Sequence, residues 1–522
     1  MRGALHDLAR LLIALGTRAL GWALRVRHRV RLMRFGRVQA ALHRRYGLGP
    51  DVPIMLHGPE LQAQLEARAG RHVAYAATSG SSGLPKRIPY TAARVRAVKQ
   101  VYMDSFCRAY AALGVRRTSL YVFSSLKQDE SLTALMMSES RSLPPFFSTL
   151  QAPYRVHAHP SMVRLAERYG TAATRLWVLA ISNPGCLYAT NPSTLSVFMD
   201  ALEDDWDGVR ALVLDWVKGA QFEPAVHRIA RRLSSLGSDR RLSHIAGSKS
   251  PVRLSEILPD LELICCWDGG YVRPFLARVM QRMTPDVQHL PMYSMSTETV
   301  ETIPHFGGGS VSFLPMGVGV RVEFLPLEAA ADPDAILAAQ DLEVGASYSL
   351  VVSDAHGLRR YHTEDVFRCV GRVGALPDLR FERRLGLSFS FTGEKLTGDH
   401  VTLAMAGVRS DFPESEKVGW MVCIPSQPEG ESVPHYRLVL GLRGPLQLDD
   451  EALSAAFDRG LCTANSEYAD KRESGRIGAP RVSRESFEAL VSLVGGERHA
   501  ESWETQFKFL PMVNRTWEEL HR

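Results

Sequence analysis

The residues best suited to chemistry form a short run of small hydroxyl and glycine residues. The run reads Thr78-Ser79-Gly80-Ser81-Ser82-Gly83-Leu84-Pro85-Lys86. Glycine accepts positive φ, and serine and threonine add short donors, so such a loop can point several N–H groups at one anion. It is not the Walker loop, in which an adjacent Gly-Lys is followed by Ser or Thr, because Lys86 lies between Pro85 and Arg87. We therefore predict a phosphate-binding loop of another class.

The alternative is a surface linker, the commonest role of Ser/Gly-rich sequence. The apolar residues 72–77 are typical of a strand that enters the loop, and residues 88–91 of a strand that leaves it. Two flanking strands favour the phosphate loop.

Three later stretches carry further polar groups beside predicted strands. The first, residues 293–298, reads YSMSTE, and the second, residues 348–372, reads YSLVVSDAHGLRRYHTEDVFRCVGR. The second predicts a hairpin with strands at 348–352 and 358–361 and a turn at 354–357. The third covers residues 465–490, and the separate tripeptide Gln506-Phe507-Lys508 follows it in the chain.

The loop resembles the phosphate loop of the adenylate-forming enzymes, which include acyl-CoA synthetases and peptide-synthetase adenylation domains. The three later stretches resemble one branch of them, the Gretchen-Hagen-type acyl acid amido synthetases known from plant auxin and jasmonate conjugation. The second stretch matches that branch over its whole length. The resemblance extends over roughly residues 75–515 and implies an ATP-dependent ligase.

The resemblance implies roles for particular residues. The loop residues Thr78, Ser79, Gly80, Ser81, Ser82, Gly83 and Lys86 would bind phosphates, and Tyr293, Ser296, Thr297, Asp365 and Arg384 would contact the rest of the nucleotide. Asp365 would accept both ribose hydroxyls, and Glu298 would hold Mg²⁺, which prefers one or two carboxylates beside phosphate oxygens. Lys395 or Lys508 would reach the α-phosphate.

Each of these roles has a simpler alternative. Glu298 could be an exposed glutamate after a Ser/Thr-rich turn, Asp365 could cap a short helix, and Lys395 could be a solvated hinge lysine. The sequence also departs from the family at two positions: Ser294 stands where tyrosine is usual, with Tyr293 one residue early, and Glu364 replaces a glycine just before Asp365.

The composition is typical of an ordinary soluble globular protein. The chain has 522 residues, of which 45% are hydrophobic and 23% charged, enough for a large core and more than one lobe. Its seven cysteines show no C-x-x-C pairs and no metal-ligand spacing, so we expect buried thiols and a reducing, cytoplasmic location.

Helical and strand patterns alternate along the chain, which predicts an α/β fold. Strands are expected at 119–124, 176–182, 261–267, 289–292, 319–325, 419–424 and 436–440, and helices at 59–67, 92–113, 162–169, 192–202, 251–258, 449–462 and after Asp399. We expect a large N-terminal domain, residues 1–394, with mixed sheets, and a small mobile C-terminal domain, residues 395–522.

Residues 1–50 hold eleven arginines against one acid, Asp7. Because the whole chain has a net charge of +6 and this segment alone carries +10, the rest sums to −4, which does not support a nucleic-acid-binding surface. The apolar positions Leu5, Leu8, Leu12, Leu15, Ala19, Trp22 and Val26 recur at three and four residues, which predicts a one-sided helix within a basic helical arm, residues 1–45.

This helix has three interpretations. A transit peptide is disfavoured because serine is absent from the segment, and no apolar run reaches the length of a membrane span. We expect the helix to pack on its own domain; weak contact with an anionic membrane surface is the alternative.

We expect the enzyme to activate a small carboxylic acid as an acyl-adenylate and to pass the acyl group to an amine. The base that deprotonates the amine could be His356, His362 or Glu298. The rivals are an acyl-CoA or carrier-protein ligase with a thiol acceptor, and an inactive nucleotide-binding homologue.

Overall fold

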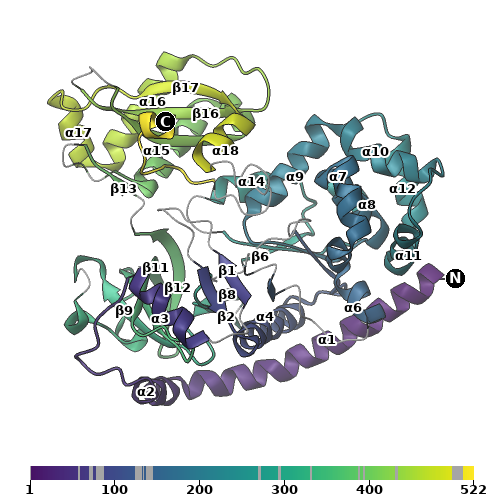
Figure 1. Cartoon of the computed structure of the whole chain (residues 1–522), viewed down its shortest axis with the longest axis horizontal. Helices are drawn as coiled ribbons and strands as arrows, with labels where there is room; N and C mark the ends of the chain where they lie inside the picture. The colour runs from purple at the N-terminus through teal and green to yellow at the C-terminus, as the bar shows by residue number, and fades with distance from the viewer. Residues whose placement is uncertain are drawn as a thin grey trace.

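The computed structural model describes residues 2–56, 59–69, 74–77, 87–123, 132, 135–136, 145–268, 272–291, 296–307, 309–329, 332–385, 388–391, 394, 396–428, 433–495 and 509–521. They form a parallel-sheet region, an antiparallel-sheet region and a C-terminal α/β region (Figure 1). None of the helices in these ranges combines the length and the apolar character needed to cross a membrane.

The predicted strands on both sides of the phosphate loop are present and pair with each other. β1 (Ala74–Ala77) is antiparallel to β2 (Arg87–Tyr90), with Ala77 opposite Arg87 at the end from which the loop leaves. The helices on either side of this hairpin, α3 (Pro59–Ala69) and α4 (Ala92–Leu113), are also confirmed.

The first large sheet is parallel throughout, in the order β3-β4-β5-β6. Its strands are β3 (Leu120–Val122), β4 (Cys186–Ala189), β5 (Leu263–Cys266) and β6 (Gln288–Pro291). Every residue of β4 and β5 is buried, as expected for strands of a parallel sheet. The helices of this region are α6 (Pro145–Gln151), α7 (Pro160–Tyr169), α8 (Thr171–Ser182), α9 (Pro192–Asp204), α10 (Trp206–Val217), α11 (Pro224–Leu233), α12 (Ser238–Gly247), α13 (Leu254–Ile257) and α14 (Arg273–Gln281).

One predicted strand is wrong. Residues 176–182 belong to helix α8, and the strand of this segment, β4, begins four residues later. α8 is buried from Ala173 to Ser182 and ends at Asn183, which has φ +44°. A short apolar run that is buried on every side shows no period, so sequence could not separate a helix from a strand here.

The second large sheet is antiparallel, in the order β12-β11-β10-β9. Its strands are β9 (Arg321–Pro326), β10 (Ser347–Ser353), β11 (Tyr361–Val373) and β12 (Leu376–Arg384), and the two-stranded sheet β7 (Ile303–Gly307) and β8 (Ser310–Leu314) lies beside β12. The hairpin predicted at 348–361 is confirmed as β10 and β11. Its return strand begins at Tyr361 rather than Leu358, because the Asp354 carboxylate accepts from the N–H groups of His356 and Leu358 and holds these residues in the turn.

The C-terminal region has its own sheet and its own buried cluster, which extends from Leu396 to Met512. β15 and β16 are antiparallel, and β16 and β17 are parallel. Its elements are β13 (Ser388–Phe389), β14 (Leu396–Thr397), α15 (Gly398–Asp411), β15 (Trp420–Ser426), β16 (His435–Leu442), α16 (Asp450–Ala464), α17 (Ser466–Glu473), β17 (Arg481–Ser486), α18 (Phe487–Gly495) and α21 (Trp517–Leu520). The predicted helices and strands of this region are present; the domain division at residue 394 stays a prediction.

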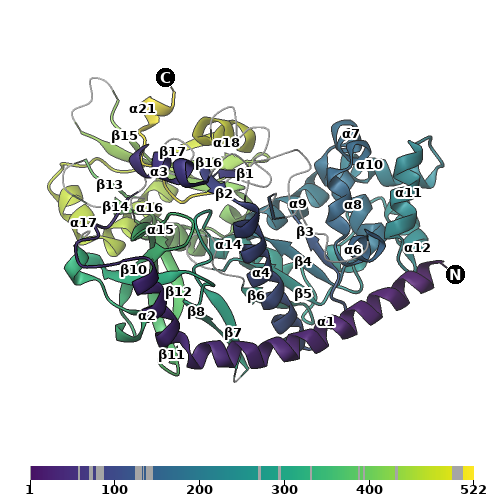
Figure 2. The same cartoon turned by 60° about the horizontal axis from the view of Figure 1, so that its bottom comes forward.

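The basic arm is helical, as predicted, and forms α1 (Arg2–Met33) and α2 (Phe35–Arg45). Figure 2 shows α1 lying across α4 and along the edge of the molecule. At Gly21 the two helices approach so closely that a Cβ would lie 2.0 Å from the carbonyl oxygen of Cys107. The helix therefore packs on its own domain.

The face that packs is not the apolar one that periodicity indicated. His6, Arg10, Ala14, Leu24 and His28 of α1 are buried against the protein. The predicted apolar stripe, with Leu5, Leu8, Leu12, Leu15, Trp22 and Val26, faces outward.

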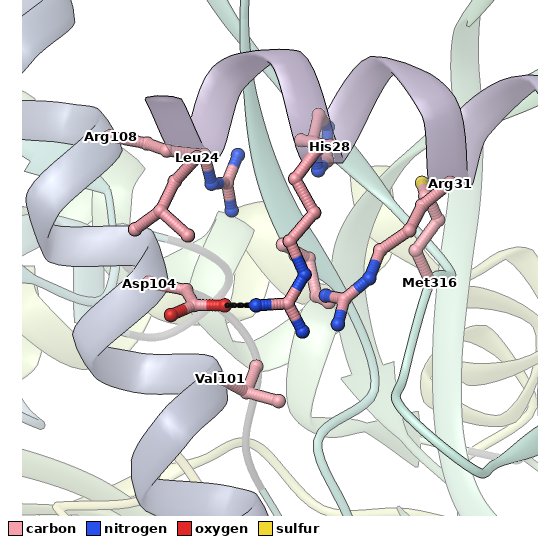
Figure 3. Close-up of a pocket in the computed structure, with 9 residues that line it drawn as sticks. Leu24, His28, Arg31, Val101, Asp104, Arg108 and Met316 are labelled. Atoms are coloured by element: carbon pink, nitrogen blue, oxygen red, sulfur yellow. Dashed lines mark ion pairs between the residues drawn. The ribbon is translucent and has the colours of Figure 1, made fainter. Parts of the chain in front are cut away.

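Figure 3 shows how the middle of α1 is anchored on α4. Leu24, His28 and Arg31 of α1 point toward Val101, Asp104 and Arg108 of α4. Arg27 forms an ion pair with Asp104 at 3.7 Å, and His28 meets His305 of β7 at 3.1 Å between ring nitrogens. Burial lowers the pKa of His28 to about 3, so this ring is neutral in the folded protein.

Candidate functional site

The strand after the predicted phosphate loop, residues 297–298 and strand β11 meet at one point of the large region. The Tyr90 hydroxyl, at the end of β2 just past the phosphate loop, donates to the carbonyl oxygen of Thr297 at 2.8 Å. The Tyr361 hydroxyl, on β11, donates to Oε1 of Glu298 at 3.0 Å. The loop exit, the segment with Glu298 and the hairpin with Asp365 are therefore joined by direct contacts.

Arg94 of α4 completes this junction. Its guanidinium donates to the carbonyl oxygens of Pro89 at 3.1 Å and Glu298 at 2.5 Å, and it pairs with the Asp354 carboxylate at 3.3 Å. Arg94 also lies over the Tyr90 ring, 4.6 Å from the centroid. One buried cation thus holds the loop exit, the Glu298 backbone and the turn of the hairpin together. The planar guanidinium of arginine, with five N–H donors, suits this task better than the ammonium group of lysine would.

Glu298 is not the exposed glutamate of the simpler alternative. Only 4% of its surface is exposed. Its side chain accepts from Tyr361, which is fully buried. A buried carboxylate is stable only with such partners, so its position follows from the fold around it.

Asp365 does not cap a helix. It lies in β11 at a β-bulge. Ser349 of β10 pairs with Val366 and Val351 pairs with His362, so β11 has more residues than β10 between these two pairs. The bulge is held by Thr363, whose hydroxyl donates to the Leu350 carbonyl and accepts from the Asp365 N–H. Bulges of this kind redirect side chains beside active sites.

The departure at Glu364 has a measurable backbone consequence. Glu364 has φ +65°, in the left-handed region that glycine adopts without strain. Its carbonyl accepts from the Leu385 N–H at 2.6 Å, which joins this turn to the end of β12. The glycine-type conformation is therefore kept although the glycine is replaced.

The remaining predicted residues divide into two groups. Ser296 and Thr297 lie at the junction, Ser296 accepting from the Thr299 N–H at 3.2 Å, and Arg384 lies opposite Asp365 in the β11–β12 register. The loop residues Thr78, Ser79, Gly80, Ser81, Ser82, Gly83 and Lys86, together with Tyr293, Lys395 and Lys508, lie outside the described residues.

Two histidines of the hairpin are half-buried or buried near this junction. Burial lowers the pKa of His356, against the raising effect of Asp354, and burial also lowers the pKa of His362. Both rings are therefore neutral near pH 7, the form that can accept a proton.

Sequence reasoning missed Arg94, Asp354 and Tyr361 as members of this site. Arg94 is 204 residues from Glu298 and lies in an ordinary helical pattern, so nothing local marks it. Asp354 and Tyr361 lie within the stretch that resembles the family, and the tyrosine that this stretch shares with the family, Tyr361, was the signal that could have been followed.

A fourth carboxylate lies where the chain enters the C-terminal region. Glu394 is buried and accepts from the Phe391 N–H at 2.8 Å and from the Tyr436 hydroxyl of β16 at 2.7 Å. Burial, followed by the contact with Glu394, raises the pKa of Tyr436. The residue before Lys395 is thus attached to the C-terminal sheet.

The likeness of the fold to solved structures defines its class. An acyl acid amido synthetase, AtGH3.15 in complex with 2,4-DB, aligns with a TM-score of 0.70 and 16% identity over 90% of this chain and 86% of that one. A 2-hydroxyisobutyryl-CoA ligase in a postadenylation state aligns with a TM-score of 0.50 and 11% identity over 90% of this chain and 81% of that one. The fold is that of the adenylate-forming enzymes, with a large N-terminal and a smaller C-terminal domain.

Within this class, domain profiles of one family match most of the chain. The N-terminal domain of the GH3 family matches residues 68–288, its central domain residues 313–384 and its C-terminal domain residues 399–516. The chain belongs to the GH3 family.

Curated relatives match over part of their length. A probable indole-3-acetic acid-amido synthetase of Oryza sativa subsp. japonica is 24% identical in an alignment of 413 residues, and the match covers 69% of this chain and 64% of the relative. A GH3 domain-containing protein of Homo sapiens is 28% identical over 166 residues, 31% of each chain. This chain thus spans less than two thirds of the length of either relative.

Proposed function

We propose that the protein is an ATP-dependent acid–amine ligase, which activates a carboxylic acid as an acyl-adenylate and transfers the acyl group to an amine. The observation that carries the proposal is the buried junction of Tyr90, Arg94, Glu298 and Tyr361, which brings the exit of the phosphate loop to the segments with Glu298 and Asp365. The names of the rice relative and of AtGH3.15 support the amine as acceptor.

In the first step a carboxylate oxygen of the acid attacks the α-phosphorus of ATP, and pyrophosphate leaves. No protein nucleophile is required, so the protein contributes position and charge. Thr78–Lys86 would bind the β- and γ-phosphates, Asp365 the ribose hydroxyls, and Ser296 and Thr297 the region of the α-phosphate. Tyr293 and Arg384 would complete the nucleotide site.

Glu298 is suited to hold Mg²⁺. Among the described residues no cluster of three or more His, Cys, Asp or Glu could bind a metal by itself. Mg²⁺ usually takes only one or two carboxylates and completes its octahedron with phosphate oxygens and water. A single buried carboxylate, oriented by the Tyr361 hydroxyl, fits that pattern, and the ion would neutralise phosphate charge there.

In the second step the amine nitrogen attacks the acyl carbonyl, the amide bond forms and AMP leaves. The amine must lose a proton, and the neutral rings of His356 and His362 are the proposed acceptors. Glu298 is the less suited candidate, because its carboxylate is already engaged by Tyr361.

The C-terminal domain would move between the two steps and exclude water from the adenylate. Lys395 or Lys508 would contact the α-phosphate during the first step and withdraw before the second. If so, Lys395→Ala and Lys508→Ala slow pyrophosphate release and amide formation to different extents. Equal and negligible effects of both substitutions on pyrophosphate release would show that neither lysine enters the site.

We also propose a reducing, cytoplasmic location. All seven cysteines are free thiols, and six of them are buried. Burial raises the pKa of Cys107 to about 11, which keeps this thiol protonated and unreactive.

The function is tested by supplying the full chain with ATP, a panel of carboxylic acids, and either coenzyme A or a mixture of amino acids. Pyrophosphate release identifies the acid, and mass spectrometry identifies the product. We expect an amide, and no consumption of coenzyme A. Thioester formed faster than amide would favour the acyl-CoA ligase, and nucleotide binding without pyrophosphate release would favour the inactive homologue.

The phosphate loop is tested within the same assay. Lys86→Ala should weaken ATP use by about 10- to 150-fold, since a hydrogen bond to a charged group contributes on the order of 1.5 to 3 kcal/mol. Ser79→Ala should weaken it less. Lys218→Ala removes an exposed lysine after α10 and is the matched control, which should leave ATP use unchanged.

A further inference from the structure

The outward face of α1 is the largest concentration of exposed apolar side chains in the described part of the chain. Of twenty large hydrophobic side chains that are exposed there, ten belong to α1, and they are between 36% and 75% exposed. They are Leu5, Leu8, Leu11, Leu12, Leu15, Leu20, Trp22, Val26, Val30 and Met33. Single exposed leucines are ordinary, but a continuous stripe of this kind marks an interaction surface.

The opposite face of α1 is fixed to the body of the protein along its length. His6 contacts the Ser234 carbonyl at 2.8 Å, Arg10 donates to the Leu233 carbonyl at 2.9 Å, and His28 meets His305 at 3.1 Å. Gly21 lies against the backbone of α4. Because these contacts hold the opposite face of α1 against the protein, the apolar stripe cannot turn inward and stays exposed on the surface.

Arginines border the stripe on both edges. Arg18, Arg25 and Arg29 are seven and four residues apart and so share one edge, while Arg27 and Arg34, seven apart, share the other. The Arg25 guanidinium lies 4.4 Å from the centroid of the exposed Trp22 ring.

Asp104 of α4 pairs with Arg27 at 3.7 Å, and α1 itself supplies no acid to the other arginines of this face. The single acid of α1, Asp7, is engaged by Arg10 at 3.1 Å and by the Leu236 N–H at 2.9 Å, on the protein side of the helix. The outward face of α1 is therefore apolar in its middle and cationic along both edges.

We propose that this face docks on an anionic phospholipid surface, with the apolar stripe at the level of the acyl chains and the bordering arginines among the headgroups. An interfacial helix combines leucine and tryptophan on one face with arginine beside them, and its affinity is the sum of apolar burial and attraction to anionic lipid. At 1.5 Å per residue, the 32 residues of α1 would contact the surface over about 48 Å.

A second copy of the chain is the less suited partner. The apolar positions 5, 8, 12, 15, 19, 22 and 26 have the spacing of a coiled-coil seam. In a pair of α1 helices, however, arginines would border the seam on both chains, and no exposed acid of α1 could pair with them. Like charges at these positions oppose association, whereas an anionic surface neutralises them.

The position of α1 is compatible with catalysis at the surface. Figure 1 shows α1 along the outer edge of the large domain, on the side away from the C-terminal domain. Docking through α1 would leave the C-terminal domain clear of the membrane, so domain closure would not be obstructed.

Co-sedimentation of the full chain with vesicles tests the proposal. One set of vesicles consists of phosphatidylcholine alone, and the other contains about 30% phosphatidylserine. We expect binding to the second set, weakened by added salt, and little binding to the first. The charge variant Arg18→Gln, Arg25→Gln, Arg29→Gln should bind at least about tenfold more weakly, because each arginine near an anionic surface adds to the affinity.

Two double variants test whether vesicle binding depends on the stripe or on any exposed apolar side chains. Leu12→Gln, Leu15→Gln alters two stripe residues that are 60% and 53% exposed, and Leu403→Gln, Leu56→Gln alters two residues elsewhere that are 64% and 53% exposed. The first pair should lose at least about tenfold in vesicle binding and the second pair should bind like the unaltered chain. Circular dichroism melting should show that both pairs are folded, since none of the four side chains is buried.

Three results would overturn the proposal. The first is failure of the unaltered chain to bind phosphatidylserine vesicles. The second is equal vesicle binding by the variant Leu12→Gln, Leu15→Gln and its control. The third is an unaltered chain that binds no vesicles but is a dimer in sedimentation velocity, and that becomes a monomer in the variant Leu12→Gln, Leu15→Gln. The last result would assign the stripe to a second copy of the chain.

Discussion

Tyr361→Phe removes one hydroxyl from the centre of the proposed site. The Tyr361 hydroxyl donates to Glu298 at 3.0 Å, and both residues are buried. A hydrogen bond to a charged group contributes about 1.5 to 3 kcal/mol. Because Glu298 would lose the donor that orients it, we expect the kcat/KM for ATP in pyrophosphate release to fall by about 10- to 150-fold.

Tyr468→Phe is the matched control. The Tyr468 hydroxyl donates to Asp458 at 2.8 Å, and Tyr468 is as fully buried as Tyr361, but both residues of this pair belong to the C-terminal region. The two substitutions should lower the melting temperature by similar amounts, whereas only Tyr361→Phe should impair pyrophosphate release. Only Tyr361→Phe should need a higher Mg²⁺ concentration to reach half of its maximal rate of pyrophosphate release.

Two results would refute this reasoning. If Tyr361→Phe released pyrophosphate like the unaltered chain, the Glu298 carboxylate would not act in the first step. If both substitutions reduced activity equally, loss of stability rather than loss of orientation would be the cause.

Four further predictions follow from the geometry. Asp365→Ala should nearly abolish pyrophosphate release and Asp365→Glu should restore little of it, since the bulge sets the position of the carboxylate; retained activity would mean that the assignment is displaced by at least one residue. Glu364→Gly should raise the free energy of unfolding by about 1 kcal/mol, because φ +65° strains a residue with a Cβ, and a lower melting temperature would contradict this. Gly21→Ala should destabilise the chain by about 1 to 3 kcal/mol because its Cβ would meet the backbone of α4, whereas Gly16→Ala, with open space around it, should be neutral or stabilising. Burial lowers the pKa of His157 from 6.5 to about 3. The unfolded chain therefore binds the proton first as the pH falls below 6.5, and His157 alone should lower the free energy of unfolding by up to about 1.4 kcal/mol per pH unit. His157→Gln should reduce the slope measured by urea unfolding by this contribution, while His28, whose pKa is also about 3, keeps its own.

Much of the fold follows from signals that are local in the chain. Helix α4 has the predicted bounds because Thr91 caps its start and Gly114, at φ +69°, ends it. The β10–β11 hairpin was predictable because its turn residues and its alternating strands lie within one short stretch. The motifs that indicate nucleotide chemistry are local in the same sense, and for this reason the GH3 resemblance could be seen in the sequence.

Tertiary structure decided what local pattern could not. Residues 176–182 are helical because the layers around them bury every side, and total burial removes the period that separates a helix from a strand. The periodicity of α1 predicted a stripe, but which face is covered depends on partners such as Ser234 and His305, more than 200 residues away. Arg94 joins segments 204 and 260 residues distant. Its role exists only because folding places those segments together, and no property of the neighbouring sequence encodes that proximity.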